Sequence, residues 1–155
     1  MKNTPTFKNN FEVIIIGGSY AELSAAMTLG RSLREVLIID NEVPCNRQTP
    51  HSQNFLTQDG KTPKEIATVA REQVAEYETI QFHQGKAISE IKTENGFEII
   101  TDKNEKFIAK KLIFATGIKD EMPEIKGFSE CWGISVIHCP YCHGYEARST
   151  KTAIF

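Results

Sequence analysis

Two cysteines near the C-terminal end of the chain have a spacing that could support redox or metal chemistry. Residues 138–146 read HCPYCHGYE, so Cys139 and Cys142 stand three positions apart with a histidine on the outer side of each. A thiolate is both a nucleophile and a metal ligand. The pair therefore has four interpretations: a zinc site, a haem attachment site, a structural disulfide or a redox-active pair.

A redox pair is the interpretation with a local mechanism. Zinc sites usually draw four ligands from two separated pairs, and His138 and His143 lie too close to the cysteines to converge easily with both sulfurs. The CPYCH string also matches the haem attachment pattern, although that attachment normally follows export. If a short helix begins here, Cys139 lies near its N-cap and Pro140 at its first position, where the helix terminus stabilises a thiolate. Spacing alone favours the redox pair and leaves the metal and haem sites open.

The composition sets the context for these thiols. The chain has 155 residues, enough for one domain of ordinary size, with 40% hydrophobic and 25% charged residues and a formal net charge of −2. That charge gives no electrostatic reason to expect nucleic acid or an anionic membrane as a partner. The polar first ten residues do not resemble a signal peptide, and the run Val13–Ile16 is too short to span a bilayer. We therefore expect a cytoplasmic protein, in which a close cysteine pair is catalytic or metal-binding rather than structural.

The N-terminal part of the chain has the pattern of a βαβ unit. EVIIIGG is a β-branched apolar run that ends in glycines, typical of a buried strand. Residues from Tyr20 to about Leu33 carry an apolar stripe at helical spacing, formed by Leu23, Ala26, Met27 and Gly30. EVLIID then predicts a second buried strand that ends at Asp40. Strand, helix and strand within about 30 residues make up such a unit.

The rest of the chain is predicted to alternate loops, one helix and short strands. Residues 41–61 form a long polar loop of a kind that is usually functional. A helix then opens with Thr62 as N-cap, Pro63 at its first position and Glu65 completing a capping box. Its apolar face is expected to comprise Ile66, Val69, Ala70, Val74 and Tyr77. Strands are predicted at 82–91, 97–101, 106–109 and 110–117, with a hairpin turn at 95–96, a linker at 118–128 and the start of a strand at 151–155.

The turn after the first strand resembles a degraded dinucleotide-binding fingerprint. Glycines are wanted at the first, third and sixth positions of the turn that begins at Gly17. Gly17 fits, Ser19 is a small substitute and Glu22 departs, adding bulk and negative charge where a pyrophosphate would bind the helix N-terminus. Asp40, about 20 residues further on, suits a ribose hydroxyl. The alternative is an ordinary glycine turn of another α/β protein.

Four segments in this order resemble thioredoxin reductase-like flavoproteins, a group within the pyridine nucleotide-disulfide oxidoreductases. The segments are IIIGGSYAELSAAMTLGR, NRQTPHSQNFLTQDG, LIFATG and HCPYCHGYE. The resemblance implies an α/β fold, with a Rossmann-like FAD-binding βαβ domain that carries a small antiparallel β insertion. It places the N-terminal part of the FAD domain at 1–117, and the linker and start of the nicotinamide and redox-cysteine domain at 118–155. On this basis we expect the N-terminal half of a longer enzyme.

The resemblance also assigns cofactor contacts residue by residue. The pyrophosphate of FAD would contact the turn, and its ribose would contact Asp40. Residues of the long loop would contact the flavin side of the cofactor, and the end of the LIFATG strand would close over it. The residues so assigned are Gly17, Gly18, Ser19, Tyr20, Ala21, Asp40, Gln48, Asn54, Ala87 (adenine), Thr116 and Gly117. Most of the NADPH-binding residues would lie outside this chain, and no metal is expected.

The implied reaction passes electrons from NADPH through FAD to the cysteine pair and on to an external disulfide. Cys142 would face the flavin and Cys139 would attack the substrate, either a thioredoxin-like protein or a small-molecule disulfide. Where thioredoxin reductases commonly carry an acidic residue, this chain has His143, which suits proton transfer near neutrality. CxxCHG followed by an aromatic residue and Glu also resembles FAD-dependent oxidases of small dithiols. A non-catalytic FAD-binding fragment is the third possibility, and we expect a homodimer in the full-length form.

Overall fold

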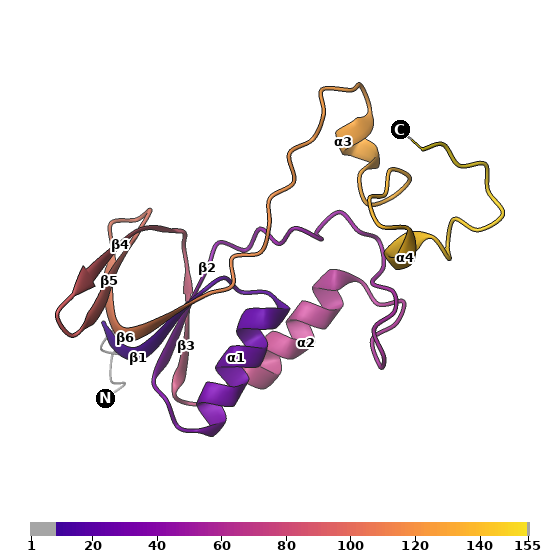
Figure 1. Cartoon of the computed structure of the whole chain (residues 1–155). Helices are drawn as coiled ribbons and strands as arrows, with labels where there is room; N and C mark the ends of the chain where they lie inside the picture. The colour runs from indigo at the N-terminus through magenta and orange to yellow at the C-terminus, as the bar shows by residue number, and fades with distance from the viewer. Residues whose placement is uncertain (1–8, 155) are drawn as a thin grey trace, which may run out of the picture. The chain divides into compact units, whose positions relative to one another are not determined.

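The computed structural model describes residues 9–154 and is built around one six-stranded sheet (Figure 1). The strand order is β3-β2-β1-β6-β5-β4, in which β3, β2, β1 and β6 are parallel neighbours and β6, β5 and β4 are antiparallel. The strands are β1 Asn10–Ile16, β2 Val36–Asp40, β3 Ile80–Gln84, β4 Ala87–Thr93, β5 Gly96–Thr101 and β6 Lys106–Phe114. The helices are α1 Tyr20–Arg31, α2 Pro63–Ala75, α3 Phe128–Cys131 and α4 Pro140–His143. This confirms the predicted α/β, Rossmann-like fold with a small antiparallel insertion.

The chain divides into two compact units. The first, the sheet unit, comprises the chain up to Pro44 together with Val69–Gly117. The second, the cysteine unit, comprises Cys45–Thr68 together with the chain from Ile118 onward. The sheet unit thus holds all six strands, α1 and the second part of α2, whereas the cysteine unit holds the long loop, the start of α2, and α3 and α4.

The two central parallel strands, β1 and β2, are buried on both faces, which explains why they are almost continuously apolar. On one face, Val13, Ile15, Val36 and Ile38 form a cluster with the apolar sides of α1 and the end of α2. On the opposite face, alternate residues of the same strands cluster with side chains of β5 and β6; this second cluster is Phe11, Ile14, Leu37, Ile39, Ile99, Phe107 and Ala109. The alternation of side chains along each strand therefore serves two cores.

The β insertion differs from the sequence prediction at three places. The hairpin turn predicted at 95–96 lies at 94–95, because Gly96 already pairs with Thr93 in the β4–β5 ladder. The predicted strand at 82–91 is two strands, because the chain turns at Gly85 and Lys86. There the Gly85 N–H donates to the Asp40 carbonyl at 3.0 Å and the Lys86 N–H donates to the Asp102 carboxylate at 3.0 Å. The predicted strands at 106–109 and 110–117 are a single strand, β6, whose first half pairs with β5 and whose second half pairs with β1.

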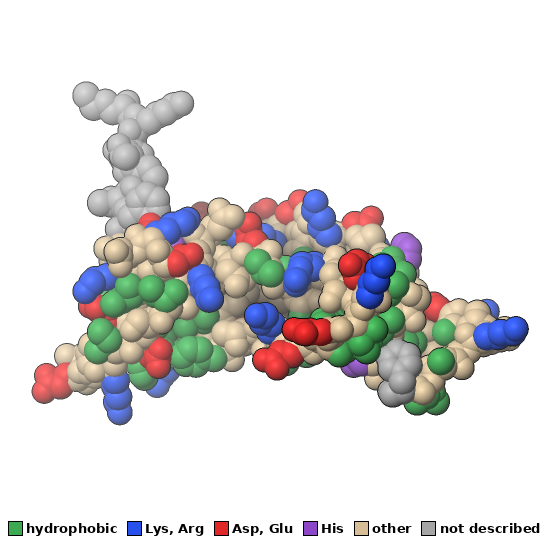
Figure 2. Space-filling view, turned by 90° about the horizontal axis from the view of Figure 1, so that it is seen from above, with side chains coloured by type: hydrophobic (Ala, Val, Ile, Leu, Met, Phe, Trp, Pro, Cys, Tyr) green, Lys and Arg blue, Asp and Glu red, His purple; other side chains and the backbone are tan. Residues whose placement is uncertain are grey.

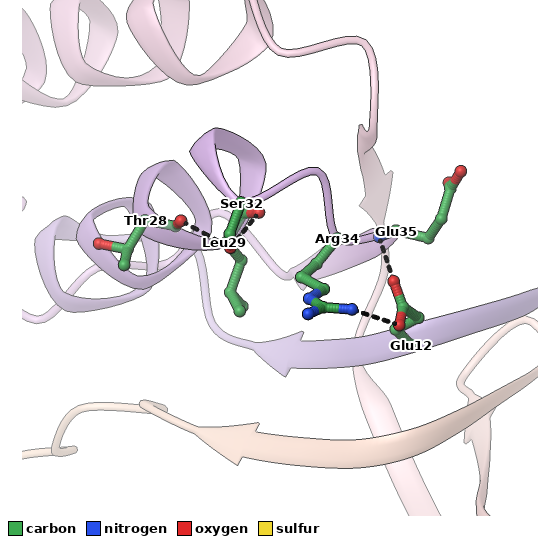
Figure 3. Close-up of polar contacts among 6 residues, drawn as sticks. All are labelled: Glu12, Thr28, Leu29, Ser32, Arg34 and Glu35. Atoms are coloured by element: carbon green, nitrogen blue, oxygen red, sulfur yellow. Dashed lines mark hydrogen bonds and ion pairs between the residues drawn. The ribbon is translucent and has the colours of Figure 1, made fainter.

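The end of α1 and the connection to β2 are fixed by local polar contacts (Figure 3). The Ser32 hydroxyl donates to the Thr28 and Leu29 carbonyls at 3.1 and 2.9 Å, which satisfies acceptors at the helix C-terminus. The Glu12 carboxylate accepts from the Glu35 N–H and from the Arg34 guanidinium, both at 3.2 Å. These contacts tie the start of β2 to β1. Leu23, Ala26 and Gly30 are buried, as the apolar stripe predicts.

The capping box of α2 forms as predicted. The Thr62 N–H donates to the Glu65 carboxylate at 2.8 Å, and the Glu65 N–H donates to the Thr62 hydroxyl at 3.2 Å. Ile66 and Val74 are buried, and Ala70 and Tyr77 pack against the core. The prediction was wrong for Val69, which is 41% exposed because it lies on the flank of the stripe set by positions 66, 70 and 74.

The C-terminal segment is mostly irregular. Residues 118–127 contain no helix or strand, as expected of the predicted linker. The strand predicted at 151–155 was wrong for Lys151–Ile154: these residues are not a strand and Ile154 is 98% exposed, because nothing in residues 9–154 pairs with them. Phe155 and the polar N-terminal residues 1–8 lie outside the described residues.

Surface and helix character bear on the partner predictions. Figure 2 shows Lys and Arg side chains interspersed with Asp and Glu over the displayed face. None of the helices within residues 9–154 has both the length and the apolar character needed to cross a membrane.

Candidate functional site

The turn after β1 requires glycine at its first position. Gly17 has a φ of +123°, which L-residues with side chains rarely adopt, and its N–H donates to the Ile39 carbonyl at 2.9 Å. A Cβ on Gly17 would also come within 2.6 Å of the Ala115 carbonyl oxygen. The turn is therefore compressed between the ends of β2 and β6, as a dinucleotide-binding turn requires.

The first turn of α1 presents backbone N–H groups at this position. Ser19 is the N-cap, with extended backbone and no hydrogen bond from its side chain to the helix. Gly18, Ser19 and Tyr20 are half-buried and Ala21 is exposed. A helix N-terminus of this kind favours an anion through its free N–H groups and its dipole.

The Glu22 side chain folds back into the turn instead of extending into solvent. Glu22 is only 3% exposed, and its carboxyl group occupies the space into which a Cβ on Gly17 would project. Burial raises the pKa of this carboxyl and the nearby charge of Asp40 raises it further, while the backbone N–H groups of Glu22 and Ser19 act in the opposite direction. The sequence indicated bulk and charge at this position but not the inward direction of the side chain.

Asp40 lies at the end of β2, with its carboxyl group against Gly18. It accepts from the Glu42 N–H at 2.8 Å and from the Arg71 guanidinium at 3.3 Å. Arg71 in turn lies over the Phe82 ring, 4.2 Å from its centroid. Sequence reasoning predicted Asp40 as a cofactor contact but did not indicate its pairing with Arg71, because nothing in a helical arginine 31 positions away signals it.

The remaining predicted residues of the sheet unit lie at strand ends. Thr116 and Gly117 follow β6 after Ala115 and are exposed, and Gly117 has a φ of +66°. Because β1, β2 and β6 are parallel neighbours, the turn at Gly17, Asp40 and Thr116 all follow carboxyl ends at one edge of the sheet. Ligands of open α/β sheets bind at that edge. Ala87 opens β4, paired with Thr101.

In the cysteine unit, the long loop is held by its own hydrogen bonds. The Ser52 N–H donates to the Lys61 carbonyl at 2.7 Å, and the Gly60 N–H donates to the Ser52 carbonyl at 2.8 Å. The Asn54 N–H donates to the Asp59 carboxylate at 2.6 Å. Gln48 is exposed on this loop.

One contact joins the loop to the cysteine segment. The side-chain amide of Asn54 donates to the Tyr141 hydroxyl at 3.3 Å, across 87 positions of sequence. Gly133, which precedes the cysteine segment, also lies against the loop, because a Cβ there would come within 3.3 Å of the Thr49 hydroxyl. The structure thus brings the predicted residue Asn54 beside the CPYC turn.

The two cysteines form a disulfide across the first turn of α4. Their Cα atoms are 5.3 Å apart, Cys139 is the N-cap and Pro140 is the first helical residue. The Cys139 sulfur accepts a hydrogen bond from the Cys142 N–H at 3.1 Å. The short helix predicted at this position is confirmed. His143 ends α4 with its side chain half-buried, and its N–H donates to the Cys139 carbonyl at 3.2 Å.

An aromatic stack precedes the cysteine pair. The Trp132 ring stacks on the His138 ring at 5.3 Å and on the Phe128 ring at 5.7 Å, and its indole N–H donates to the Asp120 carboxylate at 3.2 Å. His138 is therefore engaged with Trp132, which the spacing of the motif did not indicate. Within residues 9–154, no group of three or more His, Cys, Asp or Glu side chains is placed to hold a metal ion.

Among known proteins, this chain is similar to thioredoxin reductases and to an oxidoreductase of solved structure. The thioredoxin reductase aclD of Aspergillus oryzae is 36% identical over 145 residues, covering 92% of this chain and 46% of that protein. The thioredoxin reductase tcpT of Claviceps purpurea is 34% identical over 149 residues. The crystal structure of an oxidoreductase from Agrobacterium tumefaciens superposes with a TM-score of 0.86 at 47% identity, covering 90% of this chain and 47% of that one.

The chain spans less than half the length of these relatives. The family model described as pyridine nucleotide-disulphide oxidoreductase matches residues 11–154, which include the turn at Gly17 and the cysteine pair. The chain therefore belongs to the pyridine nucleotide-disulphide oxidoreductase family.

Proposed function

We propose that this chain supplies the dinucleotide turn and the redox-active cysteines of a thioredoxin reductase-like disulfide oxidoreductase. The observation that carries the proposal is the Cys139–Cys142 disulfide across the first turn of α4, with the Cys139 sulfur bonded to a backbone N–H. The same N–H would stabilise a thiolate on Cys139 after reduction. Relatives named thioredoxin reductases support this assignment.

FAD is the cofactor that the fold suggests, with NADPH as the electron donor. When bound, FAD would supply two-electron transfer between a nicotinamide and a disulfide. Three features of the sheet unit support this proposal: Gly17 makes the tight turn, α1 begins directly after it, and Asp40, at the end of β2, is the residue proposed to contact a ribose hydroxyl. Glu22 is the exception among the residues of the turn. We retain Gln48, Asn54, Ala87, Thr116 and Gly117 as further contacts on the strength of the family resemblance.

The chemistry of the cysteine unit is thiol–disulfide exchange. With both cysteines reduced, the Cys139 thiolate attacks one sulfur of the substrate disulfide and the other substrate sulfur leaves as a thiolate. Cys142 then attacks Cys139, which re-forms the internal disulfide and releases the second substrate thiol. The substrate disulfide becomes one thiolate and one thiol, the internal dithiol becomes a disulfide, and the proton lost from Cys142 is gained by the second substrate sulfur as it leaves.

His143 is proposed to carry that proton. It directly follows Cys142, and its N–H bond to the Cys139 carbonyl holds it at the end of the same turn. Histidine exchanges protons readily near neutral pH. A thioredoxin-like protein or a small-molecule disulfide is the proposed substrate, and residues 118–155 are proposed to lead into the nicotinamide domain.

A second function is favoured by the sequence after Cys142, where His143 replaces the common acidic residue and is followed by Gly144. This CxxCHG pattern resembles that of FAD-dependent dithiol oxidases. The second function is oxidation of a small dithiol, in which the substrate loses two electrons and two protons to the internal disulfide and dioxygen is reduced to hydrogen peroxide. The reductase and oxidase reactions pass electrons in opposite directions and therefore give different products. Hydrogen peroxide formed from dithiol and air would favour the oxidase, whereas thiols formed from disulfide and NADPH would favour the reductase.

The decisive experiment traps the exchange intermediate on this chain alone. Reduced Cys142→Ser protein is mixed with a disulfide such as oxidised thioredoxin or oxidised glutathione, and the products are identified by mass spectrometry under non-reducing conditions. We expect a stable mixed disulfide on Cys139, because its resolving partner is gone. Reduced Cys139→Ser protein should form it much more slowly.

A control variant and the contrary outcomes define how the result is interpreted. Cys45→Ser removes an exposed free cysteine of the same unit and should leave trapping unchanged. Equal trapping on Cys139 and Cys142 would contradict the assignment of Cys139 as the attacking thiol. Absence of trapping in both variants, or tightly bound zinc that depends on both cysteines, would overturn the redox function.

A further inference from the structure

The phosphate-binding end of the turn already holds an anion that belongs to the chain. The carboxyl group of Glu22 lies against Gly17, and Glu22 is 3% exposed even though it lies in the first turn of a helix that begins near the surface. Carboxylates are rarely buried to this degree unless they have partners. The partners here are the backbone N–H groups of Ser19 and Glu22.

The sequence explains why the side chain turns inward. Ser19-Tyr20-Ala21-Glu22 matches the S-x-x-E capping box, in which the third helical residue reaches back to the N–H of the N-cap. The Ser19 side chain makes no bond to the helix, whereas the Glu22 carboxyl is close enough to the backbone N–H groups of Ser19 and Glu22 to interact with them. The glutamate thus lies beside N–H groups that a pyrophosphate would otherwise use.

The charged and polar groups around Glu22 also oppose the binding of a pyrophosphate. From β2, the Asp40 carboxylate faces the same turn at Gly18, and it is balanced by Arg71 of α2 at 3.3 Å. From the end of β6, the Ala115 carbonyl oxygen borders Gly17. A pyrophosphate that enters this site would therefore be repelled by the carboxylates of Glu22 and Asp40 and by the carbonyl oxygen of Ala115. The guanidinium of Arg71 is already paired with Asp40.

We infer that Glu22 is an internal competitor for the pyrophosphate position, so that a dinucleotide binds this chain only when the Glu22 carboxylate is displaced or uncharged. The inference rests on the proposed function, because it concerns the same turn and the same cofactor. It predicts that the chain binds FAD weakly at neutral pH. It also predicts that binding tightens as the pH falls, because burial favours the protonated form of Glu22.

The test is a flavin-fluorescence titration of the 155-residue chain with FAD at a series of pH values from 8 downward. Four proteins are compared: wild type, Glu22→Gln, which keeps the size and removes the charge, Glu22→Gly, which removes both, and Glu72→Gln, which makes the same change at an exposed position of α2. At pH 8 we expect Glu22→Gly to bind at least about tenfold more tightly than wild type, with Glu22→Gln in between. Only wild type and Glu72→Gln should gain affinity as the pH falls and Glu22 takes up a proton.

Glycine within a helix lowers its stability, so circular dichroism of each variant is recorded first and Glu22→Ala serves if Glu22→Gly unfolds. ADP titrated in parallel reports on the pyrophosphate without the flavin. Equal FAD affinity in all four proteins, with no pH dependence, would overturn the inference and leave the proposed function standing. If no variant binds FAD or ADP, the inference and the cofactor assignment fail together.

Discussion

The two units of the chain are stabilised in different ways. The sheet unit has fully buried side chains on both faces of its parallel strands, among them Ile14, Ile15, Ile38 and Ile39. In the cysteine unit, the described residues from Ile118 onward include no buried side chain, and its loop segment contributes only Pro63 and Ile66 to the buried set. Hydrogen bonds within the loop, the aromatic stack at Trp132 and the disulfide hold that unit instead.

This difference suggests that the sheet unit determines the stability of the fold, whereas the proposed redox chemistry depends on the cysteine unit. Hydrophobic burial dominates the free energy of folding, so the sheet unit should determine stability. The cysteine pair that we propose to be redox-active depends on a local turn that Cys139 and Pro140 specify within a few residues. Substitutions should therefore affect stability in one unit and reactivity in the other.

The largest expected effect is truncation in the core of the sheet unit. Ile38→Ala removes a fully buried side chain that packs between β1 and the helices, and should lower the free energy of unfolding by about 2–5 kcal/mol. The matched change Ile134→Ala in the cysteine unit, where the residue is 61% exposed, should cost about 0.5 kcal/mol or less. Urea denaturation measures both. Similar losses from both variants would show that the units are equally important for stability.

A smaller effect is expected at the start of α2, where the cysteine unit contains a defined helix cap. Thr62→Ala removes the hydroxyl that accepts from the Glu65 N–H and should cost about 0.5–2 kcal/mol. Thr68→Ala, an exposed threonine on the same helix, is the control. Thermal unfolding monitored by circular dichroism gives the comparison, and an unchanged melting temperature in Thr62→Ala would mean that the cap contributes nothing to stability.

Next is the pH dependence of the sheet unit. The pKa of Glu22 is raised in the folded protein, so the folded state binds more protons than the unfolded state between the unfolded and folded pKa values. Stability should therefore fall as the pH rises through that window. Glu22→Gln should be more stable than wild type at neutral pH, by less than the Thr62 effect because backbone N–H groups partly offset burial.

Wild type and Glu22→Gln also test whether the stability contribution of Glu22 changes with pH in the expected direction. The difference in unfolding free energy between Glu22→Gln and wild type should shrink as the pH is lowered through the folded pKa of Glu22. A difference that stays constant with pH would assign the effect to packing rather than to charge.

The smallest effect concerns the exposed contacts of Glu12. The Glu35 N–H is the main cause that lowers the pKa of Glu12, and Arg34 contributes less. In Arg34→Met, an NMR titration should show the pKa of Glu12 rising only part of the way to its ordinary value. Stability from this group is present above the unfolded pKa and is lost as the pH falls through the folded pKa. A complete return to the ordinary value would make Arg34 the dominant partner.

Sequence reasoning succeeded where local pattern determines structure. The runs before Gly17 and before Asp40 are apolar and β-branched, so two buried parallel strands follow from them. The cap at Thr62 and the turn at Cys139 depend on residues within three positions of each other. These elements were predicted correctly because their contacts are short in sequence.

Features set by distant contacts were not predictable in the same way. The break at Gly85 depends on hydrogen bonds to Asp40 and to the hairpin, so the segment reads as one strand in isolation. The pairing of Arg71 with Asp40 spans 31 positions, and the inward rotamer of Glu22 depends on the space above Gly17. Both are decided by packing that composition and periodicity do not encode.

The continuity of β6 has a consequence for how the chain can tolerate insertions. One unbroken strand serves the antiparallel hairpin through Lys106–Ala109 and the parallel sheet through Ile108–Phe114. A single residue inserted after Ala109, where the pairing with β5 ends, would turn Leu112 and Ile113 to each other's face of the sheet and displace Thr116 from the carboxyl edge. Length variation should therefore be excluded from β6 and accommodated at the turn between β4 and β5, where an added residue changes the register of neither core.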